Sequence, residues 1–122
     1  EPSRLALLHY DYCMRNLMLT PERDAIRGLF DFEAVRFGDA LYDAVKLTFN
    51  EIPDDPEGCR AYLEGYIEAG GHPMDWERFR LYQAINGIGA MAWVDKWEEE
   101  FASRHQEFRE KGRRVLVESM SG

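Results

Sequence analysis

The sequence predicts an α+β fold in which short strands come first and helices make up the rest of the chain. Three short apolar runs lie within the first thirty residues, separated by polar, turn-rich segments, a pattern typical of strands. Beyond Gly38, apolar residues recur at spacings of three and four, which is typical of amphipathic helices. We therefore expect a single domain, 1–122, with strands and loops in residues 1–38 and a helical subdomain in residues 39–122.

The composition is sufficient for a buried core, since 45% of the 122 residues are hydrophobic and 13% are aromatic. No apolar run approaches the roughly 18 residues of a membrane span, so we expect no membrane segment. The formal net charge of −8 argues against nucleic acid as a partner and suits a cationic ligand, although acidity also serves solubility. Cys13 and Cys59 are isolated, which predicts a reducing, cytoplasmic location.

Polar residues are concentrated after the first apolar run. Leu5–Leu8 predicts a buried strand, and it leads into a loop that contains His9 and Asp11 and ends at Asn16. Asp11 carries a carboxylate of the kind that accepts a proton from a substrate hydroxyl. This loop is therefore the first candidate for a site with chemistry.

Residues 17–30 predict a β-hairpin. Two apolar runs flank a segment of turn composition: Leu17–Leu19, Thr20–Asp24 and Ile26–Phe30. If residues 23–24 form a two-residue turn, Asn16 lies opposite Asp31 with Cβ atoms roughly 4.5–5.5 Å apart, and a longer loop shifts this pairing by a residue or two. An amide oxygen and a carboxylate are the oxygen ligands that Mg²⁺ accepts, together with phosphate oxygens and water. The hairpin therefore predicts a metal site made by Asn16 and Asp31 beside Asp11.

Two motifs in this region resemble a known family. His9-x-Asp11-x-x-x-x-Asn16, followed fifteen residues later by Asp31-Phe32-Glu33, resembles the catalytic loop and metal-binding motif of kinase-like phosphotransferases. The short hairpin between the motifs and the segment Phe37–Asp43 are similar to the aminoglycoside phosphotransferase and choline kinase group. The resemblance implies the helical C-terminal lobe of the protein-kinase-like fold, with the small hairpin carrying the catalytic and metal-binding loops.

The function that the resemblance implies is ATP-dependent O-phosphotransfer to a hydroxyl of a small, cationic substrate of the aminoglycoside type. Mg²⁺ is the implied cofactor and ATP the co-substrate. Asp11 is then the catalytic base, with Asn16 and Asp31 as metal ligands. Four further residues have supporting roles: His9, Glu33, Asp39 and Asp43. Among these, we expect the His9 ring to hold the loop by hydrogen bonding, and Glu33 either to reach metal or substrate or to remain solvated.

The sequence departs from the usual pattern of this group at two positions. Tyr10 stands where Gly is usual between the His and the Asp, and Ala40 stands where Pro is usual. Neither departure removes a reactive group, so both leave the acceptor substrate open. A choline-like or other small-alcohol kinase is one alternative, and a non-catalytic kinase-like binding module is another. The intact set of Asp11, Asn16 and Asp31 argues against the second alternative.

Four helices are expected after Gly38. Asp39 and Asp55 are predicted N-caps of the first two helices, which end near Asn50 and at Gly70. The third helix is predicted from Asp75 to about Trp97. It is apolar on nearly every side and is therefore expected to be buried centrally. Further expectations are close helix packing at Gly87, a buried structural Asn86 and a last helix from Glu98 onward.

A phosphotransferase of this kind also needs an N-terminal lobe with a strand lysine that contacts the nucleotide phosphates. The three lysines here, Lys46, Lys96 and Lys111, fall on predicted helices after the motifs. We therefore expect the nucleotide-binding lobe to be absent from this chain and the chain to be inactive alone. The apolar surface that such a lobe would cover, around Leu5–Leu8, Phe30, Phe32 and Phe37, is expected to favour self-association.

Overall fold

The computed structural model describes residues 5–51, 55–70, 74–97 and 102–121, which belong to two compact units. The first unit is Glu1–Gly71 and the second is His72–Gly122. This division lies elsewhere than the predicted parts 1–38 and 39–122, because two helices belong with the strands. The elements are β1 Leu5–Leu8, a 3₁₀ turn Met14–Asn16, β2 Leu17–Leu19, β3 Ile26–Leu29, β4 Arg36–Asp39, α1 Leu41–Glu51, α2 Pro56–Glu68, α3 Trp76–Trp97 and α4 Ala102–Ser121.

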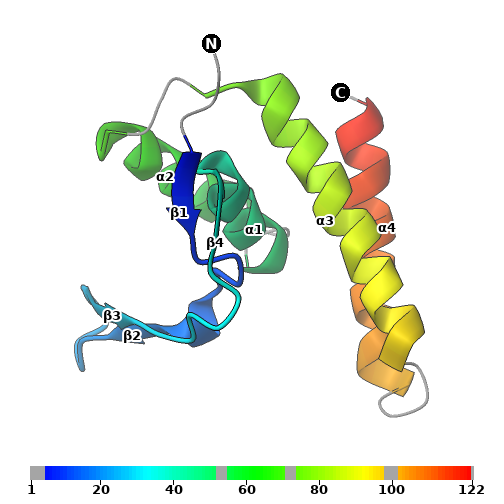
Figure 1. Cartoon of the computed structure of the whole chain (residues 1–122), viewed down its shortest axis with the longest axis horizontal. Coiled ribbons are helices and arrows are strands. Elements are labelled where there is room, and N and C mark those ends of the chain that lie inside the picture. The colour runs from blue at the N-terminus through cyan, green and yellow to red at the C-terminus, as the bar shows by residue number, and fades with distance from the viewer. Residues whose placement is uncertain (1–4, 52–54, 71–73, 98–101, 122) are drawn as a thin grey trace. The chain divides into compact units, whose positions relative to one another are not determined.

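Strands β1 and β4 form an antiparallel pair that runs from Leu5 opposite Asp39 to Leu8 opposite Arg36 (Figure 1). The prediction of a buried strand is wrong for one face of β1. Leu8 is 4% exposed, whereas Leu5 and Leu7 are 76% and 64% exposed. Alternate residues of a strand point to opposite faces, and the described residues cover only the face of Leu8. Strand β4 was not predicted from the sequence, in which Asp39 indicates only the N-cap of the next helix.

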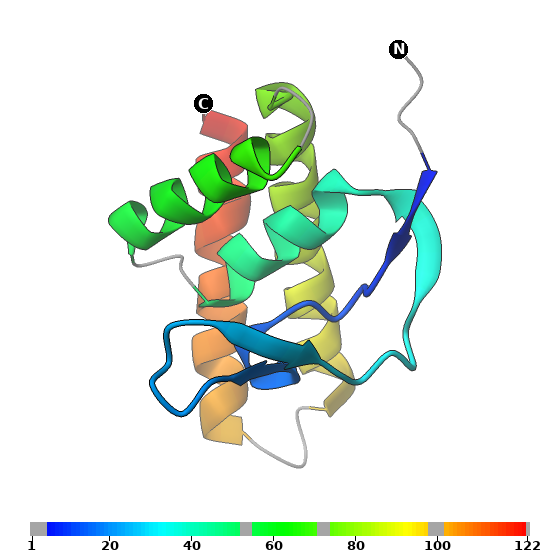
Figure 2. The same cartoon turned by 90° about the vertical axis from the view of Figure 1, so that its left-hand side faces the viewer.

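Strands β2 and β3 form the predicted hairpin, but its register differs from the predicted one (Figure 2). Leu17 pairs with Leu29, and a shift in pairing follows between Met18 and Leu19. Asn16 therefore lies opposite Phe30, whose N–H donates to the Asn16 carbonyl oxygen at 3.0 Å, and the predicted pairing with Asp31 is wrong by one residue.

The cause of this shift is the length of the hairpin loop. Residues 20–25 connect the strands instead of a two-residue turn, and the Thr20 N–H donates to the Ala25 carbonyl oxygen at 2.9 Å. The Thr20 hydroxyl donates to the Asp24 carboxylate at 2.6 Å and accepts from two backbone N–H groups of the loop. Arg23 adopts the left-handed backbone at φ 61°. The loop thus has its own hydrogen-bonded structure.

Helix α2 begins directly after its predicted N-cap Asp55, whereas Asp39 ends β4 and lies two residues before the start of α1 at Leu41. The Asp39 carboxylate accepts from the Leu41 N–H at 3.1 Å, and the Asp55 carboxylate accepts from the Gly58 N–H at 2.9 Å. Such caps satisfy N–H groups that have no partner inside the helix. Past the end of α2, Gly70 has φ 98°. The buried side chains of α1 are Leu41, Ala44, Val45, Leu47, Thr48 and Phe49.

Helices α3 and α4 make up the second unit and run side by side (Figure 1). A Cβ on Gly87 would meet the Gly112 carbonyl oxygen at 2.7 Å, and a Cβ on Gly112 would meet the Gly87 carbonyl oxygen at 2.8 Å. The two backbones are therefore in contact, which confirms close packing at Gly87. Asn86 is buried, and its side-chain nitrogen donates to the Tyr82 carbonyl oxygen at 2.9 Å.

Within its own unit α3 is buried along one stripe only, and its expected central burial stays a prediction. Phe79, Ala90 and Val94 are buried, but five large apolar side chains of α3 are exposed: Trp76, Leu81, Ile85, Ile88 and Trp93. Within the unit one partner helix covers only one stripe of α3, which explains the exposed remainder. No helix in the described ranges is long and apolar enough to cross a membrane.

Candidate active site

The loop that follows β1 is fixed to the start of α1 by one carboxylate. Asp43 Oδ2 accepts from the His9 N–H at 2.7 Å, and Asp43 Oδ1 accepts from the Tyr10 N–H at 3.0 Å. Hydrogen bonds to a charged group contribute about 1.5–3 kcal/mol each. Asp43 therefore stabilises the backbone immediately before Asp11, thirty-odd residues away in the sequence.

Tyr10 adopts a left-handed backbone, with φ 68°. This conformation costs a residue with a Cβ atom roughly 1–2 kcal/mol, whereas glycine adopts it readily. The Tyr10 ring stacks on the Tyr42 ring with centroids 4.8 Å apart and planes 9° apart, and the Arg36 guanidinium lies 3.5 Å from the Tyr10 ring centre. Burial, followed by a hydrogen bond with Tyr10, raises the pKa of Tyr42. Tyr10 is thus in close contact with side chains of both α1 and β4.

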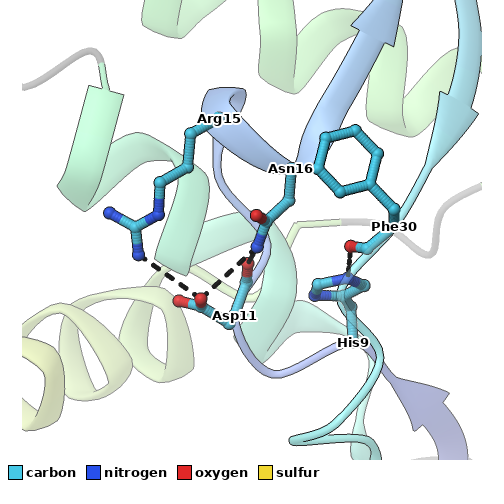
Figure 3. A network of polar contacts seen from close by, with 5 residues as sticks. All are labelled: His9, Asp11, Arg15, Asn16 and Phe30. Atoms are coloured by element: carbon cyan, nitrogen blue, oxygen red, sulfur yellow. Dashed lines mark hydrogen bonds and ion pairs between the residues drawn. The ribbon is translucent and has the colours of Figure 1, made fainter.

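Asp11 is held from one side by two donors (Figure 3). The Asn16 side-chain nitrogen donates to the Asp11 carbonyl oxygen at 2.9 Å and to Asp11 Oδ2 at 3.3 Å. An Arg15 guanidinium nitrogen also donates to Asp11 Oδ2, at 3.3 Å. Asp11 Oδ1 accepts no hydrogen bond from any residue that the structure describes. The carboxylate is therefore oriented through Oδ2.

His9 connects the loop of Asp11 to the residues after the hairpin. Its ring nitrogen Nε2 donates to the Phe30 carbonyl oxygen at 2.8 Å (Figure 3). The ring is buried and packs edge-to-face on Phe32, with centroids 4.8 Å apart. Nδ1 is buried without a hydrogen-bond partner among the described residues. The ring hydrogen bond expected for His9 is present, and it joins the two segments that carry the sequence motifs.

Asp31 differs from Asp11 in its surroundings. It is exposed, has φ 68°, and its side chain makes no hydrogen bond or ion pair with a described residue. Glu33 is also exposed, in the turn that follows. Non-glycine residues with positive φ are concentrated at functional sites, where the strained backbone aims a side chain. The metal site predicted from the sequence, in which Asn16 and Asp31 bind the same ion, stays a prediction.

The donor atoms of Asn16 and Asp31 fit Mg²⁺ chemically. Because the Asn16 nitrogen makes both hydrogen bonds to Asp11, its side-chain oxygen is directed elsewhere (Figure 3). The Asp31 carboxylate has no described partner to displace. Within the described ranges, no group of three or more His, Cys, Asp or Glu side chains is gathered for metal binding. Mg²⁺ is usually held by one or two carboxylates together with phosphate oxygens and water, so two protein oxygens are compatible with it.

Burial is the largest cause of a raised pKa at four tyrosines of the first unit, and the negative charge of Asp39 or Asp43 adds to it: Tyr12, Tyr42, Tyr62 and Tyr66. Burial, and then the negative charge of Asp43, raises the pKa of Tyr12. Burial, and then the negative charge of Asp39, raises the pKa of Tyr66 on α2. The first unit therefore combines carboxylates and phenol rings near the loop of Asp11.

Sequence reasoning missed three residues of this site. Arg15 follows Asp11 by four residues inside the predicted loop, and this spacing could have indicated the ion pair between them. Arg36 and Tyr42 reach Tyr10 through the pairing of β4 and the start of α1. The available clue to them was Tyr10 itself, a bulky residue where the related group usually has Gly.

The comparisons with known proteins agree with the motifs. Residues 1–82, about two thirds of the chain, match the model of the phosphotransferase enzyme family APH. An aminoglycoside 3'-phosphotransferase of Streptomyces ribosidificus is 33% identical over 88 residues, which cover 70% of this chain and 34% of that protein. One from Streptomyces fradiae is 31% identical over 88 residues, covering 70% of this chain and 33% of that protein. No solved structure matches significantly.

The chain spans about a third of the length of these curated relatives. The family match nevertheless includes both sequence motifs, the hairpin between them and helices α1 and α2. The chain belongs to the phosphotransferase enzyme family.

Proposed function

We propose that this chain is the part of an ATP-dependent O-phosphotransferase that carries the catalytic loop and binds the acceptor substrate. The enzyme is of the aminoglycoside phosphotransferase type. The fold of this part is then the helical C-terminal lobe of the protein-kinase-like fold, with the β2–β3 hairpin between its catalytic and metal-binding loops. The observation that carries the proposal is the geometry of Asp11. Its Oδ2 is held by Asn16 and Arg15, while Oδ1 accepts no hydrogen bond from a described residue.

Asp11 orients the acceptor hydroxyl and takes its proton on Oδ1. The acceptor oxygen forms a bond to the γ-phosphorus of ATP, the bond from that phosphorus to the ADP oxygen breaks, and ADP leaves. Phosphoryl transfer depends mainly on positioning and on charge stabilisation. The two backbone N–H groups held by Asp43 and the ring of His9 bonded to Phe30 keep Asp11 in position.

Asn16 and Asp31 hold Mg²⁺ in this proposal, through the Asn16 side-chain oxygen and the Asp31 carboxylate. A bound Mg²⁺ supplies positive charge that neutralises the phosphate oxygens. Glu33, exposed in the turn after Asp31, lies close in sequence to this ligand. Three roles stay open for Glu33: a contact with the ion, a contact with a cationic acceptor, or a solvated or loop-capping position.

A small cationic acceptor is favoured by charge. The chain has a net charge of −8, and the carboxylates of Asp39 and Asp43 lie near enough to Tyr66 and Tyr12 to raise their pKa values. The curated relatives are aminoglycoside 3'-phosphotransferases. A polycationic aminoglycoside is therefore the acceptor class that we propose, in the cytoplasm, where ATP is available.

The nucleotide-binding lobe of such an enzyme is not supplied by these 122 residues in our proposal, because the chain spans only about a third of its relatives. The exposed apolar side chains Leu5, Leu7 and Phe37 are candidates for covering by that lobe or by a second copy. The 122-residue chain by itself is then expected to hydrolyse or transfer no ATP phosphate.

The test uses the full-length protein, by which we mean this chain together with the proposed nucleotide-binding lobe. Its ATP consumption is assayed with a panel of aminoglycosides and with choline, at low salt. We expect ATP turnover that depends on an aminoglycoside and on Mg²⁺, with a phosphorylated aminoglycoside identified by mass spectrometry. Turnover of choline alone would identify a small-alcohol kinase instead. Absence of turnover with every acceptor would contradict the proposal and favour a non-catalytic binding module.

A second assay uses the 122-residue chain, with the full-length protein as its matched control. We expect no turnover by the chain under conditions in which the full-length protein is active. Light scattering on the same sample measures whether the chain forms dimers or larger assemblies. Turnover by a monomer of the chain would overturn the assignment of the nucleotide site to another part of the protein.

A further inference from the structure

We propose that Tyr10 is a positioning residue, clamped by Tyr42 and Arg36, that holds the loop of Asp11 in its left-handed bend. The proposal rests on the proposed function, because it concerns the conformation from which Asp11 acts. It assigns a role to a contact between three side chains that neither the family match nor the sequence motifs describe.

The first step of the argument is the backbone. Tyr10 lies directly before Asp11, and its φ of 68° turns the chain between the strand β1 and the carboxylate. A residue with a Cβ atom disfavours this region, whereas glycine does not. A tyrosine at this position therefore remains there only if its surroundings hold it.

The second step is what the Tyr10 ring touches. It stacks on Tyr42 of α1 in a nearly parallel arrangement, with planes 9° and centroids 4.8 Å apart. The Arg36 guanidinium of β4 lies 3.5 Å from the ring centre, well within the roughly 6 Å of a cation–π contact. Arg36 is itself tethered by a hydrogen bond from Nε to the Ala34 carbonyl oxygen at 3.3 Å. Two different elements thus hold one ring.

The third step connects the ring to Asp11. The Tyr10 N–H donates to Asp43 Oδ1 at 3.0 Å, so the peptide group of Tyr10 is held at the same time as its ring. Tyr42 and Asp43 are neighbours in the first turn of α1. One helix start therefore holds Tyr10 by both its backbone and its side chain, and the next residue is Asp11. Losing the ring contacts removes what offsets the unfavourable backbone.

The experiment compares Tyr10→Ala with Tyr10→Gly in the full-length protein. Alanine loses the ring but retains the strained backbone, whereas glycine loses the ring and also relieves the strain. We expect Tyr10→Ala to lower kcat by about tenfold and Tyr10→Gly to lower it by less than about threefold, with KM for the acceptor nearly the same in both. If Tyr10 instead bound the acceptor, both variants would raise KM alike, and the proposal would be overturned.

The clamp is tested by a double-mutant cycle with Arg36→Met, which keeps the aliphatic length of the side chain. We expect about a threefold to tenfold loss of kcat when Tyr10 is present and less than about a twofold further loss in the Tyr10→Gly background, since the contact that Arg36 makes is already gone. Arg27→Met is the matched control, because Arg27 is an exposed arginine on β3. Equal losses from Arg36→Met in both backgrounds would contradict the clamp.

Amide hydrogen exchange gives a readout that does not depend on activity. We expect the protection of the His9 and Tyr10 amides, relative to unstructured peptides, to fall at least about tenfold in Tyr10→Ala and to fall less in Tyr10→Gly. If the full-length protein turns over no acceptor at all, the proposed function fails. The positioning role of Tyr10 is then decided only by the amide protection of Tyr10→Ala compared with that of Tyr10→Gly. Equal protection in the two variants would refute it.

Discussion

The loop of residues 9–16 and the segment of residues 30–35 each carry a carboxylate of the candidate site, but the protein holds the two carboxylates differently. Asp11 Oδ2 accepts from Asn16 and Arg15, and Asp43 accepts from the two backbone N–H groups that precede Asp11. The Asp31 side chain is exposed and has no hydrogen-bond partner among the described residues.

Under the proposed function, this difference matches what each carboxylate has to bind. In the proposed reaction Asp11 orients a neutral hydroxyl, which binds weakly by itself, so the protein has to supply the orientation beforehand. Asp31 would meet a divalent cation, whose charge is strong enough to orient a carboxylate on arrival. In the proposed site, Asp11 is therefore a base that is oriented before the substrate binds, and Asp31 is a metal ligand that the ion orients. The following predictions test this contrast.

The largest effect is expected for Asp11→Asn in the full-length protein. It should lower kcat by a factor on the order of 10²–10⁴ with little change in nucleotide affinity, because it removes the proton acceptor and retains the shape. Steady-state kinetics and nucleotide titration measure the two quantities. Glu22→Gln, which changes an exposed carboxylate in the hairpin loop, is the matched control. An unchanged kcat would make Asp11 a structural residue.

The second-largest effect is expected for the stability of the loop of residues 9–16. Asp43→Ala should lower the free energy of unfolding by about 2–4 kcal/mol, since it leaves the His9 and Tyr10 N–H groups without their acceptor. Denaturant unfolding measures the loss, with Glu22→Ala as the control for removing an exposed carboxylate. Equal losses in the two variants would mean that the Asp43 clamp contributes little.

Asp31→Ala, unlike Asp43→Ala, should change the Mg²⁺ dependence of activity and leave the free energy of unfolding nearly unchanged. The free energy of unfolding should change by less than about 0.5 kcal/mol, because the side chain is exposed and has no described partner. The Mg²⁺ concentration for half-maximal activity should rise at least about tenfold, the lower end of what loss of an outer partner of a metal ligand causes. A large loss of stability without a change in Mg²⁺ dependence would reverse the comparison between the loops.

The smallest effect is expected for Arg15. Its side chain is 75% exposed, and exposed ion pairs contribute about 0–1 kcal/mol, so Arg15→Gln should lower kcat by less than about fivefold. Asn16 continues to hold Asp11 Oδ2 in this variant. Kinetics at low and at high salt should show the difference between wild type and variant shrinking as salt screens the pair. A loss of a hundredfold or more would mean that Arg15 contacts the transferring phosphate.

Much of the first unit could be predicted from local sequence signals. The caps Asp39 and Asp55 act on the next few residues, and the hairpin strands are short apolar runs around polar residues. The register could not be derived in the same way. It depends on the hydrogen bonds of Thr20 inside a six-residue loop, and turn composition does not distinguish this loop from a tighter turn.

Long-range contacts explain the other failures. β4 is a strand because Arg36–Asp39 pairs with β1, and its own residues include only one large apolar side chain, so periodicity gave no sign of it. The exposed stripe on α3 depends on how many partners the helix has, which its apolar composition does not specify. The contacts of Asp43 and Tyr42 with the loop cross more than thirty residues of sequence. The motifs identified the residues of the candidate site, and the contacts that hold them required the structure.

The most direct test of the difference between the two loops uses Mn²⁺ in place of Mg²⁺ in the full-length protein with ADP, followed by NMR. Mn²⁺ broadens the signals of nuclei close to it. We predict that the Asn16 side-chain amide and the Asp31 backbone amide broaden together as Mn²⁺ is added, and that Asp31→Ala abolishes both effects while the chemical shifts of residues 9–13 before metal addition remain unchanged. Broadening of the Asn16 signal that persists in Asp31→Ala, or disruption of residues 9–13 by that substitution alone, would contradict the account.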